Sequence, residues 1–189
     1  MDQRGPHPNV PHPASRHTLP VLGAPIDVVR MSDAVSRIEA WAAAGESRVV
    51  CICNAHSVVT ASREPAFAEV LALADLATPD GAPVAWMLRR QGAASQSRVT
   101  GPDLMAEYCA RADHSGQPIY LYGSSDTTLA LLQQRLLQRW PGLRIVGAHA
   151  PPFRPCTEAE DAADVERINA SGASTVWVSL GCPKQEAWM

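Results

Sequence analysis

Short apolar runs alternate with segments of helical periodicity in the second half of the chain, and this pattern limits the possible folds more than any other feature. Residues 118–123, 143–148 and 174–181 have the length and β-branched or aromatic content of strands. Residues 126–140 separate the first two runs and carry leucines at helical spacing. Because parallel strands need a crossover between them, the pattern predicts an α/β fold with a mostly parallel sheet flanked by helices.

The first half predicts further elements of the same kind. They are, in chain order, a short N-terminal β-hairpin around Gly23, a helix starting at Ser32 or Asp33, a strand at 48–53, a helical region to Ala74 broken near Pro65, a short strand at 75–80 and a helix at 101–112. The run at 48–53 is continuously apolar, so we expect a strand that is buried on both faces. A capping-box pattern, Thr157-x-x-Glu160, predicts the start of another helix.

Length and charge restrict the function classes. A chain of 189 residues fits one domain, expected at 19–189 after a disordered, proline- and histidine-rich leader at 1–18. A formal net charge of −3 does not favour nucleic acid as the main partner. No apolar run approaches the roughly 18 residues that a membrane-spanning helix needs.

The five cysteines form no CxxC pair and no cluster at zinc-finger spacing. Cys51 and Cys53 lie in the apolar run at 48–53, where alternation places both thiols on one face of the strand. We therefore expect buried thiols rather than a metal site, in a protein of a reducing cytoplasm.

Ligands of open parallel sheets bind beyond the carboxyl ends of the strands. This rule selects the loops CNAHS (53–57), PDGAP (79–83), YGSSDTT (122–128) and LGCPKQE (180–186). In the third loop, Gly123 allows close approach of the backbone, and Ser124 lies where the first amides of a helix can hold a phosphate. An ordinary joint between a strand and a helix explains the same residues equally well.

The other loops offer polar groups suited to a phosphorylated, hydroxyl-rich ligand. Lys184 suits a phosphate and Gln185 a sugar hydroxyl or a phosphate oxygen, although both residues also fit the start of a helix. Arg98 suits a diphosphate, and the alternative is a surface arginine paired with Asp103. Asn54 can bind a sugar or serve as a cap.

Asp80 raises the central question. Asp-Gly is a turn dipeptide, so Asp80 and Gly81 alone indicate only a sharp exit from a strand. Asp80 is, however, the only carboxylate placed centrally among the strand-end loops. Together with the polar residues of the other strand-end loops, Asp80 is therefore the candidate catalytic base.

Six motifs in order resemble the WecG/TagA/CpsF glycosyltransferases: N-A-H at 54–56, PDG at 79–81, RVTGPDL at 98–104, YLYGSS at 120–125, WPGLRIVG at 140–147 and LGCPKQEAW at 180–188. The resemblance covers about residues 20–189. It implies a Rossmann-like fold and an enzyme of exopolysaccharide, enterobacterial antigen or teichoic acid synthesis. The expected reaction is inverting transfer of a hexose or N-acetylhexosamine from a UDP-sugar, with no metal and no cofactor.

The resemblance also assigns partners and roles. The acceptor is a polyprenyl-diphosphate-linked sugar at the inner face of the cytoplasmic membrane, and a homo-oligomer is left open. The proposed base of the family matches Asp80, its diphosphate-side arginine matches Arg98, its PKQE glutamine matches Gln185 and its strand-end asparagine matches Asn54. Family members commonly place Thr where this chain has Ile52.

Members also continue past PKQE with a segment that contacts the membrane, which the domain at 19–189 lacks. Two other functions stay open. One is a catalytically silent UDP-sugar-binding domain, which Ile52 and the shorter chain favour. The other is a nucleotide-cofactor oxidoreductase, against which stands the absence of a glycine-rich fingerprint after the strand at 48–53.

Overall fold

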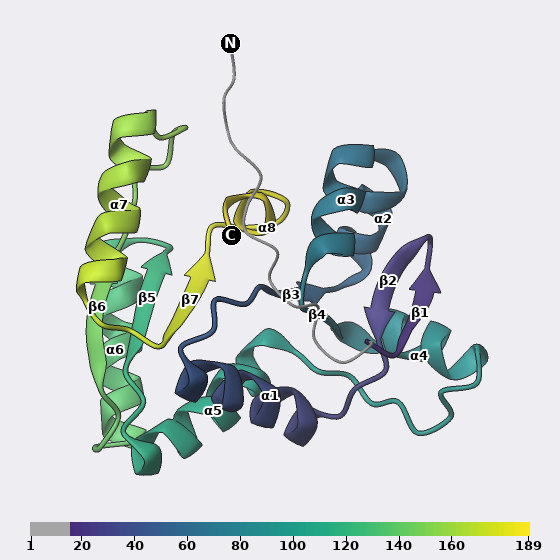
Figure 1. Ribbon diagram of the computed structural model, residues 1–189, viewed down its shortest axis with the longest axis horizontal. Helices are drawn as coiled ribbons and strands as arrows, with labels where there is room; N and C mark the ends of the chain where they lie inside the picture. The colour runs from purple at the N-terminus through teal and green to yellow at the C-terminus, as the bar shows by residue number, and fades with distance from the viewer. Residues whose placement is uncertain (1–15) are drawn as a thin grey trace.

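The structure, a computed structural model, describes residues 16–189. Its strands are β1 (Thr18–Val21), β2 (Ala24–Asp27), β3 (Val50–Cys53), β4 (Leu76–Pro79), β5 (Ile119–Gly123), β6 (Ile145–His149) and β7 (Thr175–Ser179) (Figure 1). Its helices are α1 (Met31–Ala44), α2 (Ala55–Arg63), α3 (Pro65–Leu73), α4 (Gly81–Arg90), α5 (Gly101–Ser115), α6 (Asp126–Arg139), α7 (Glu158–Ala170) and α8 (Lys184–Trp188). None of these helices combines the length and apolar character needed to cross a bilayer.

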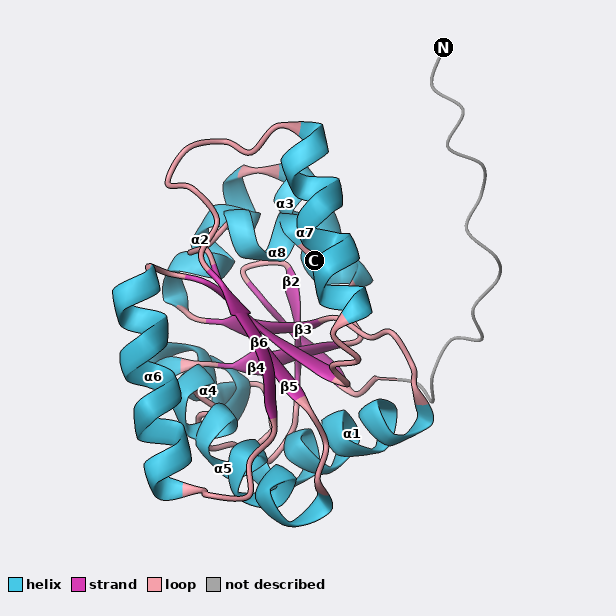
Figure 2. Cartoon of the chain, turned by 90° about the vertical axis from the view of Figure 1, so that its left-hand side faces the viewer, coloured by secondary structure: helices cyan, strands magenta, loops and turns pink. Residues whose placement is uncertain are grey.

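The strands confirm an α/β fold with parallel sheets flanked by helices and an N-terminal hairpin. β1 and β2 form the antiparallel hairpin, with Val21 opposite Ala24. β3 pairs in parallel with β4, and β5 pairs in parallel with both β6 and β7. Figure 2 shows helices on both sides of the crossing strands. The parallel strands are divided between two sheets, because no pairing joins β3 to β7 among the described residues.

The larger apolar core spans both parallel sheets, and a second core lies between the β3–β4 sheet and the hairpin. Leu104 and Tyr108 of α5, with Val35 of α1, pack toward Leu121 of β5. Phe67 and Leu71 of α3 pack with Cys51 and Cys53 against the hairpin. Both of these thiols are fully buried, which confirms the expectation for them. Burial raises the pKa of Cys51 to about 12, so its thiol stays protonated at neutral pH.

The predicted helices are confirmed, and their ends follow local chemistry. Pro65 separates α2 from α3, because a proline suits the first position of a helix. The capping box of α7 is present: Thr157 Oγ1 accepts from the Glu160 amide at 3.3 Å, and the Thr157 amide donates to Glu160 Oε2 at 2.9 Å. α4 was not predicted from the sequence. Pro83 and the Asp-Gly pair indicate a turn there, yet both prolines and glycines are tolerated in the first turn of a helix.

Two boundaries differ from expectation. Residues 1–15 of the expected leader lie outside the described residues, but Arg16 pairs with Asp27 at 2.7 Å, so the folded part begins before Leu19. β3 is not buried on both faces, because Val50 and Ile52 are half-buried. Both residues line a cavity on the side of β3 away from β4.

Candidate active site

Asp80 lies at the carboxyl end of β4, where the chain enters α4. Its amide donates to the Cys53 carbonyl at 3.0 Å, which extends the pairing of β4 with β3 by one residue. Asp80 occupies the N-cap position of α4, but its side chain makes no capping hydrogen bond. Gly81 follows with a φ of 80°, a left-handed conformation that favours glycine. The turn thus presents a half-buried carboxylate that does not cap α4.

Burial raises the pKa of the Asp80 carboxyl above its ordinary value, and the charge of Asp103 adds to this effect. The Gly81 amide and the positive charge of Arg98 oppose it without cancelling it. A carboxylate with a raised pKa holds a proton more firmly and is therefore a stronger general base. Asp80 can therefore form the turn and also act as a base.

Arg98 lies at the same end of the β3–β4 sheet. The Val99 amide donates to the Pro79 carbonyl at 2.8 Å, so the backbone beside Arg98 runs along the end of β4. Asp103 accepts a hydrogen bond from Thr100 Oγ1 at 2.7 Å rather than from Arg98. Within residues 16–189 the exposed Arg98 guanidinium makes no hydrogen bond or ion pair, so the alternative pairing with Asp103 is not found.

Asn54 is the N-cap of α2 and follows the last residue of β3. Its Oδ1 accepts from the Ser57 amide at 3.1 Å and from Ser57 Oγ at 3.3 Å. Cys53 is opposite Pro79 in the parallel register, so Asn54 and Asp80 follow adjacent strand ends. Capping occupies the carbonyl oxygen of Asn54 and leaves its NH₂ group as a donor on an exposed side chain.

Gly123 and Ser124 belong to the other parallel sheet, at the end of β5. Both have positive φ, 110° and 61°. The Ser124 amide donates to the Ser179 carbonyl at 2.8 Å, which holds the ends of β5 and β7 together. Ser125, rather than Ser124, caps α6 by accepting from the Thr128 amide at 3.2 Å. The glycine in this loop is therefore required by close backbone packing, whatever the loop binds.

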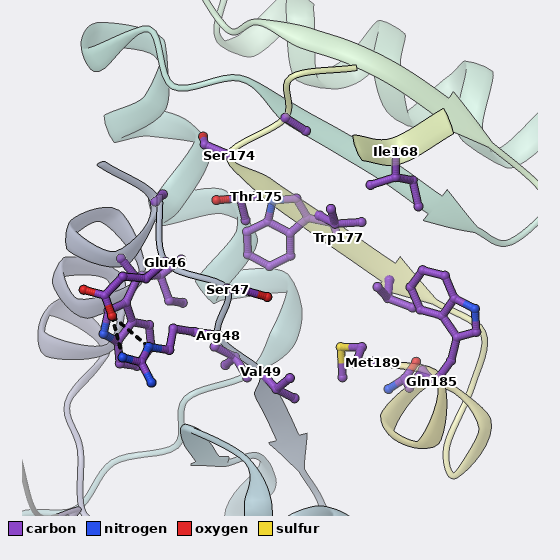
Figure 3. A pocket seen from close by; sticks show the side chains of 18 of the residues that line it. Glu46, Ser47, Arg48, Val49, Ile168, Ser174, Thr175, Trp177, Gln185 and Met189 are labelled. Atoms are coloured by element: carbon purple, nitrogen blue, oxygen red, sulfur yellow. Dashed lines mark hydrogen bonds and ion pairs between the residues drawn. The ribbon is translucent and has the colours of Figure 1, made fainter. Parts of the chain in front are cut away.

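Lys184 and Gln185 diverge at the start of α8. The exposed Lys184 lines a pocket of about 320 Å³ together with Tyr122 and Trp188. Gln185 lines a larger cavity of about 720 Å³ between β3 and β7 (Figure 3). Its Oε1 accepts from the Gly181 amide at 3.2 Å, and its Nε2 donates to the Glu186 carboxylate at 3.0 Å. The two predicted ligand-binding side chains therefore serve different cavities.

Glu186 is a residue that sequence reasoning missed. It lies in the first turn of α8, yet its side chain is only 2% exposed. One carboxylate oxygen accepts from Gln185, and the other, Oε2, is buried without a hydrogen-bond partner. Nothing in the local sequence distinguishes it from a surface glutamate except its place beside Gln185 in a crowded polar segment.

Asn54, Asp80 and Arg98 thus converge at the end of the β3–β4 sheet. Gly123, Ser124 and the LGCPKQE segment (180–186) lie at the end of the β5–β7 pair. Within residues 16–189 no group of histidine, cysteine or acidic side chains is arranged to hold a metal ion. The family model described as "Glycosyl transferase WecG/TagA/CpsF family" matches residues 19–189, nearly the whole chain. The chain therefore belongs to the WecG/TagA/CpsF family of glycosyltransferases, which act in cell-surface polysaccharide synthesis.

Proposed function

We propose that this chain transfers a hexose or N-acetylhexosamine, such as N-acetylmannosamine or glucose, from a UDP-sugar to a polyprenyl-diphosphate-linked sugar. The transfer inverts the anomeric centre, uses no metal and takes place at the cytoplasmic face of the membrane. Family membership supports the reaction class. The observation that carries the mechanism is the half-buried Asp80 carboxylate, left uncapped beside Arg98 at the end of the β3–β4 sheet.

Asp80 is the proposed general base. It takes the proton of the acceptor hydroxyl as that oxygen attacks the anomeric carbon, and the bond from this carbon to the UDP oxygen breaks in the same step. A single displacement needs one base and no covalent nucleophile. Asp80 supplies that base, with the Gly81 amide and the Arg98 guanidinium beside it.

Arg98 is the proposed partner of the leaving diphosphate. The bond to UDP breaks with development of negative charge, which a fixed cation stabilises more in the transition state than in the ground state. Arg98 has its donors free for this role, and its positive charge already acts on the Asp80 carboxyl. Asn54 offers its NH₂ group to a sugar hydroxyl at the adjacent strand end. Gln185 and Lys184 are proposed to contact the donor from the other side.

The test is a transfer assay with purified protein, a panel of UDP-sugars and a short-chain polyprenyl diphosphate sugar, with and without EDTA. Asp80→Asn is expected to lower turnover at least about 10²-fold, the usual scale for loss of a general base. UDP binding, measured by calorimetry, should change little. Asp33→Asn is the matched control, because Asp33 is an exposed aspartate in the first turn of α1, outside the site.

Near-normal transfer by Asp80→Asn would contradict the role of Asp80. UDP binding without transfer to any acceptor in the unmodified protein would instead support a silent UDP-sugar-binding domain. Loss of transfer in EDTA would contradict the metal-free mechanism.

A further inference from the structure

Helix α4 has an outer side that the fold leaves uncovered. Its inner side carries Val84 and Leu88, which are buried in the core shared with the hairpin. The outer side carries five exposed residues, Ala82, Pro83, Trp86, Arg89 and Arg90. Because residues three and four positions apart share one side of a helix, these five form a single stripe. We call this stripe the α4 outer face.

Trp86 is the most unusual member of the α4 outer face. Its side chain is 56% exposed, whereas the other four tryptophans of the chain are all partly buried. An indole combines a large apolar body with one polar N–H group, and tryptophan is for this reason enriched where apolar and aqueous phases meet. The exposed indole therefore suits the boundary between a lipid bilayer and water.

The charge around Trp86 is basic. Residues 81–102 contain Arg89, Arg90 and Arg98 and no acidic residue, although the whole chain has a formal net charge of −3. Arg90 follows Trp86 by one helical turn and makes no hydrogen bond or ion pair within residues 16–189. Arg89 donates one hydrogen bond, to the Gln96 carbonyl at 2.8 Å, and keeps its other donors. An anionic surface is therefore attracted to this face and repelled by the chain as a whole.

The α4 outer face starts at the candidate base. Asp80 is the N-cap of α4, and Trp86 lies six residues further on, which is about 9 Å along the helix axis. In the proposed acceptor, one sugar and a diphosphate separate the attacking hydroxyl from the lipid carbons. An acceptor whose hydroxyl is at Asp80 can therefore have its lipid near Trp86.

We propose that the α4 outer face binds the surface of an anionic phospholipid bilayer. The Trp86 indole lies at the level of the headgroups, and Arg89 and Arg90 bind lipid phosphates. The helix lies along the surface and does not cross it, as an amphipathic interfacial helix does. This proposal rests on the proposed function, in which the acceptor is anchored in that bilayer, and it holds Asp80 where the acceptor headgroup emerges.

A bilayer explains this face better than a second copy of the chain does. In a twofold dimer the same patch of both copies meets itself. Such contact would bring Arg89 and Arg90 of the two copies together, and the α4 outer face has no acidic residue to pair with them. Lipid phosphates supply that missing negative charge.

Helix α6 provides a matched control. Leu131 is also 56% exposed, and Arg135 follows it by one helical turn, as Arg90 follows Trp86. Figure 1 shows α4 and α6 at opposite ends of the long axis of the molecule. A bilayer on the α4 outer face therefore does not touch Leu131.

The test measures sedimentation of the whole protein with vesicles of phosphatidylglycerol and phosphatidylcholine, and with vesicles of phosphatidylcholine alone. We expect binding to the anionic vesicles only. Trp86→Ser should weaken it at least about tenfold, since the indole no longer enters the interface. Arg90→Gln should weaken it about fivefold, the usual effect of one arginine near an anionic surface. Leu131→Ser and Arg135→Gln should change it by less than about twofold.

Fluorescence gives an independent readout of where the indole lies. Vesicles that contain brominated phospholipid should quench the emission of the unmodified protein. Trp86→Phe keeps an aromatic side chain and should still bind, but this quenching should be lost. Quenching that persists in Trp86→Phe would place another tryptophan at the bilayer and contradict the proposal.

Two acceptors separate this proposal from the proposed function. Trp86→Ser and Arg90→Gln should keep transfer to a short-chain, water-soluble polyprenyl diphosphate sugar and lose transfer to a long-chain acceptor held in vesicles. Vesicle binding through α4 without transfer to any acceptor would support the bilayer contact and count against the proposed function.

Three results would overturn the bilayer proposal while leaving the proposed function intact. One is transfer to the soluble acceptor by a protein that binds no vesicle. Another is equal loss of vesicle binding in the α4 and α6 variants. The third is a dimer that Trp86→Ser dissociates, because a second copy of the chain would then cover the α4 outer face.

Discussion

Gly123 at the end of β5 lies directly against the Ser179 carbonyl at the end of β7. A Cβ atom added to Gly123 would fall far inside van der Waals contact with that oxygen and its carbonyl carbon. The φ of Gly123 is also 110°, a conformation that side chains rarely adopt. This contact fixes the distance between two strand-end loops of the site, YGSSDTT and LGCPKQE.

Gly123→Ala should therefore destabilise the protein by about 3 kcal/mol or more, because both steric overlap and backbone strain oppose it. Gly116→Ala is the matched control. Gly116 also has a positive φ, 73°, but a Cβ there would meet nothing within 4 Å. We expect it to cost only about 1 kcal/mol. Urea unfolding of both variants measures the difference, and equal losses would show that the contact with Ser179 is not limiting.

Thr157→Ala should lower the free energy of unfolding by about 1 kcal/mol, because it removes the hydroxyl that accepts from the Glu160 amide at the start of α7. Thr127→Ala is a suitable control, since Thr127 is exposed in α6 and does not cap it. Urea unfolding checks both variants. A loss as large for Thr127→Ala as for Thr157→Ala would mean that the cap contributes nothing specific.

The sequence predicted these local features well, because each depends on residues within one element. Neighbouring residues were enough to predict the capping box, the break at Pro65 and the shared face of Cys51 and Cys53. The sequence did not predict the separation of β3 from β7, because these two strands are more than a hundred residues apart in the chain. A continuous apolar run such as 48–53 predicts a strand but not which of its edges is paired.

The candidate site shows the same limit. Motif order suggested Asp80, Asn54 and Arg98 as candidate site residues, and the parallel register explains why they lie at one end of the β3–β4 sheet. The residues PKQE were read as one polar segment, whereas α8 turns Lys184 to one cavity and Gln185 to another. The burial of Glu186 depends on how α8 packs, which its neighbours in the sequence do not specify.

Arg154 holds the carboxyl of Glu160 in its charged form. Its guanidinium donates to both carboxylate oxygens, at 2.8 Å and 2.6 Å, and the hydrogen bond with Arg154 is the largest cause that lowers the pKa of Glu160 to about 2. Arg154→Ala should raise this pKa toward the ordinary value for glutamate, while Arg154→Lys should raise it less. Carboxyl titration by NMR measures the shift. A pKa that stays near 2 in Arg154→Ala would mean that the Thr157 amide alone is sufficient.

The pKa of Asp80 is shifted in the opposite direction to that of Glu160, and we expect this shift to make stability depend on pH. Its pKa is raised in the folded protein, chiefly by burial, so folding favours the protonated carboxyl. That contribution to stability is fully present below the pKa of Asp80 in the unfolded chain and is lost as pH rises through its higher pKa in the folded protein.

At pH 7 the ionised Asp80 therefore destabilises the fold, and Asp80→Asn should be more stable than the unmodified protein. Its advantage should shrink as pH falls toward the folded pKa of Asp80. Urea midpoints measured from pH 3 to pH 7 follow this trend, with Asp33→Asn as the control that shows no such gain. An Asp80→Asn protein that is less stable at pH 7, or whose advantage does not change with pH, would show that the cation beside Asp80 outweighs its burial and would weaken its assignment as the base.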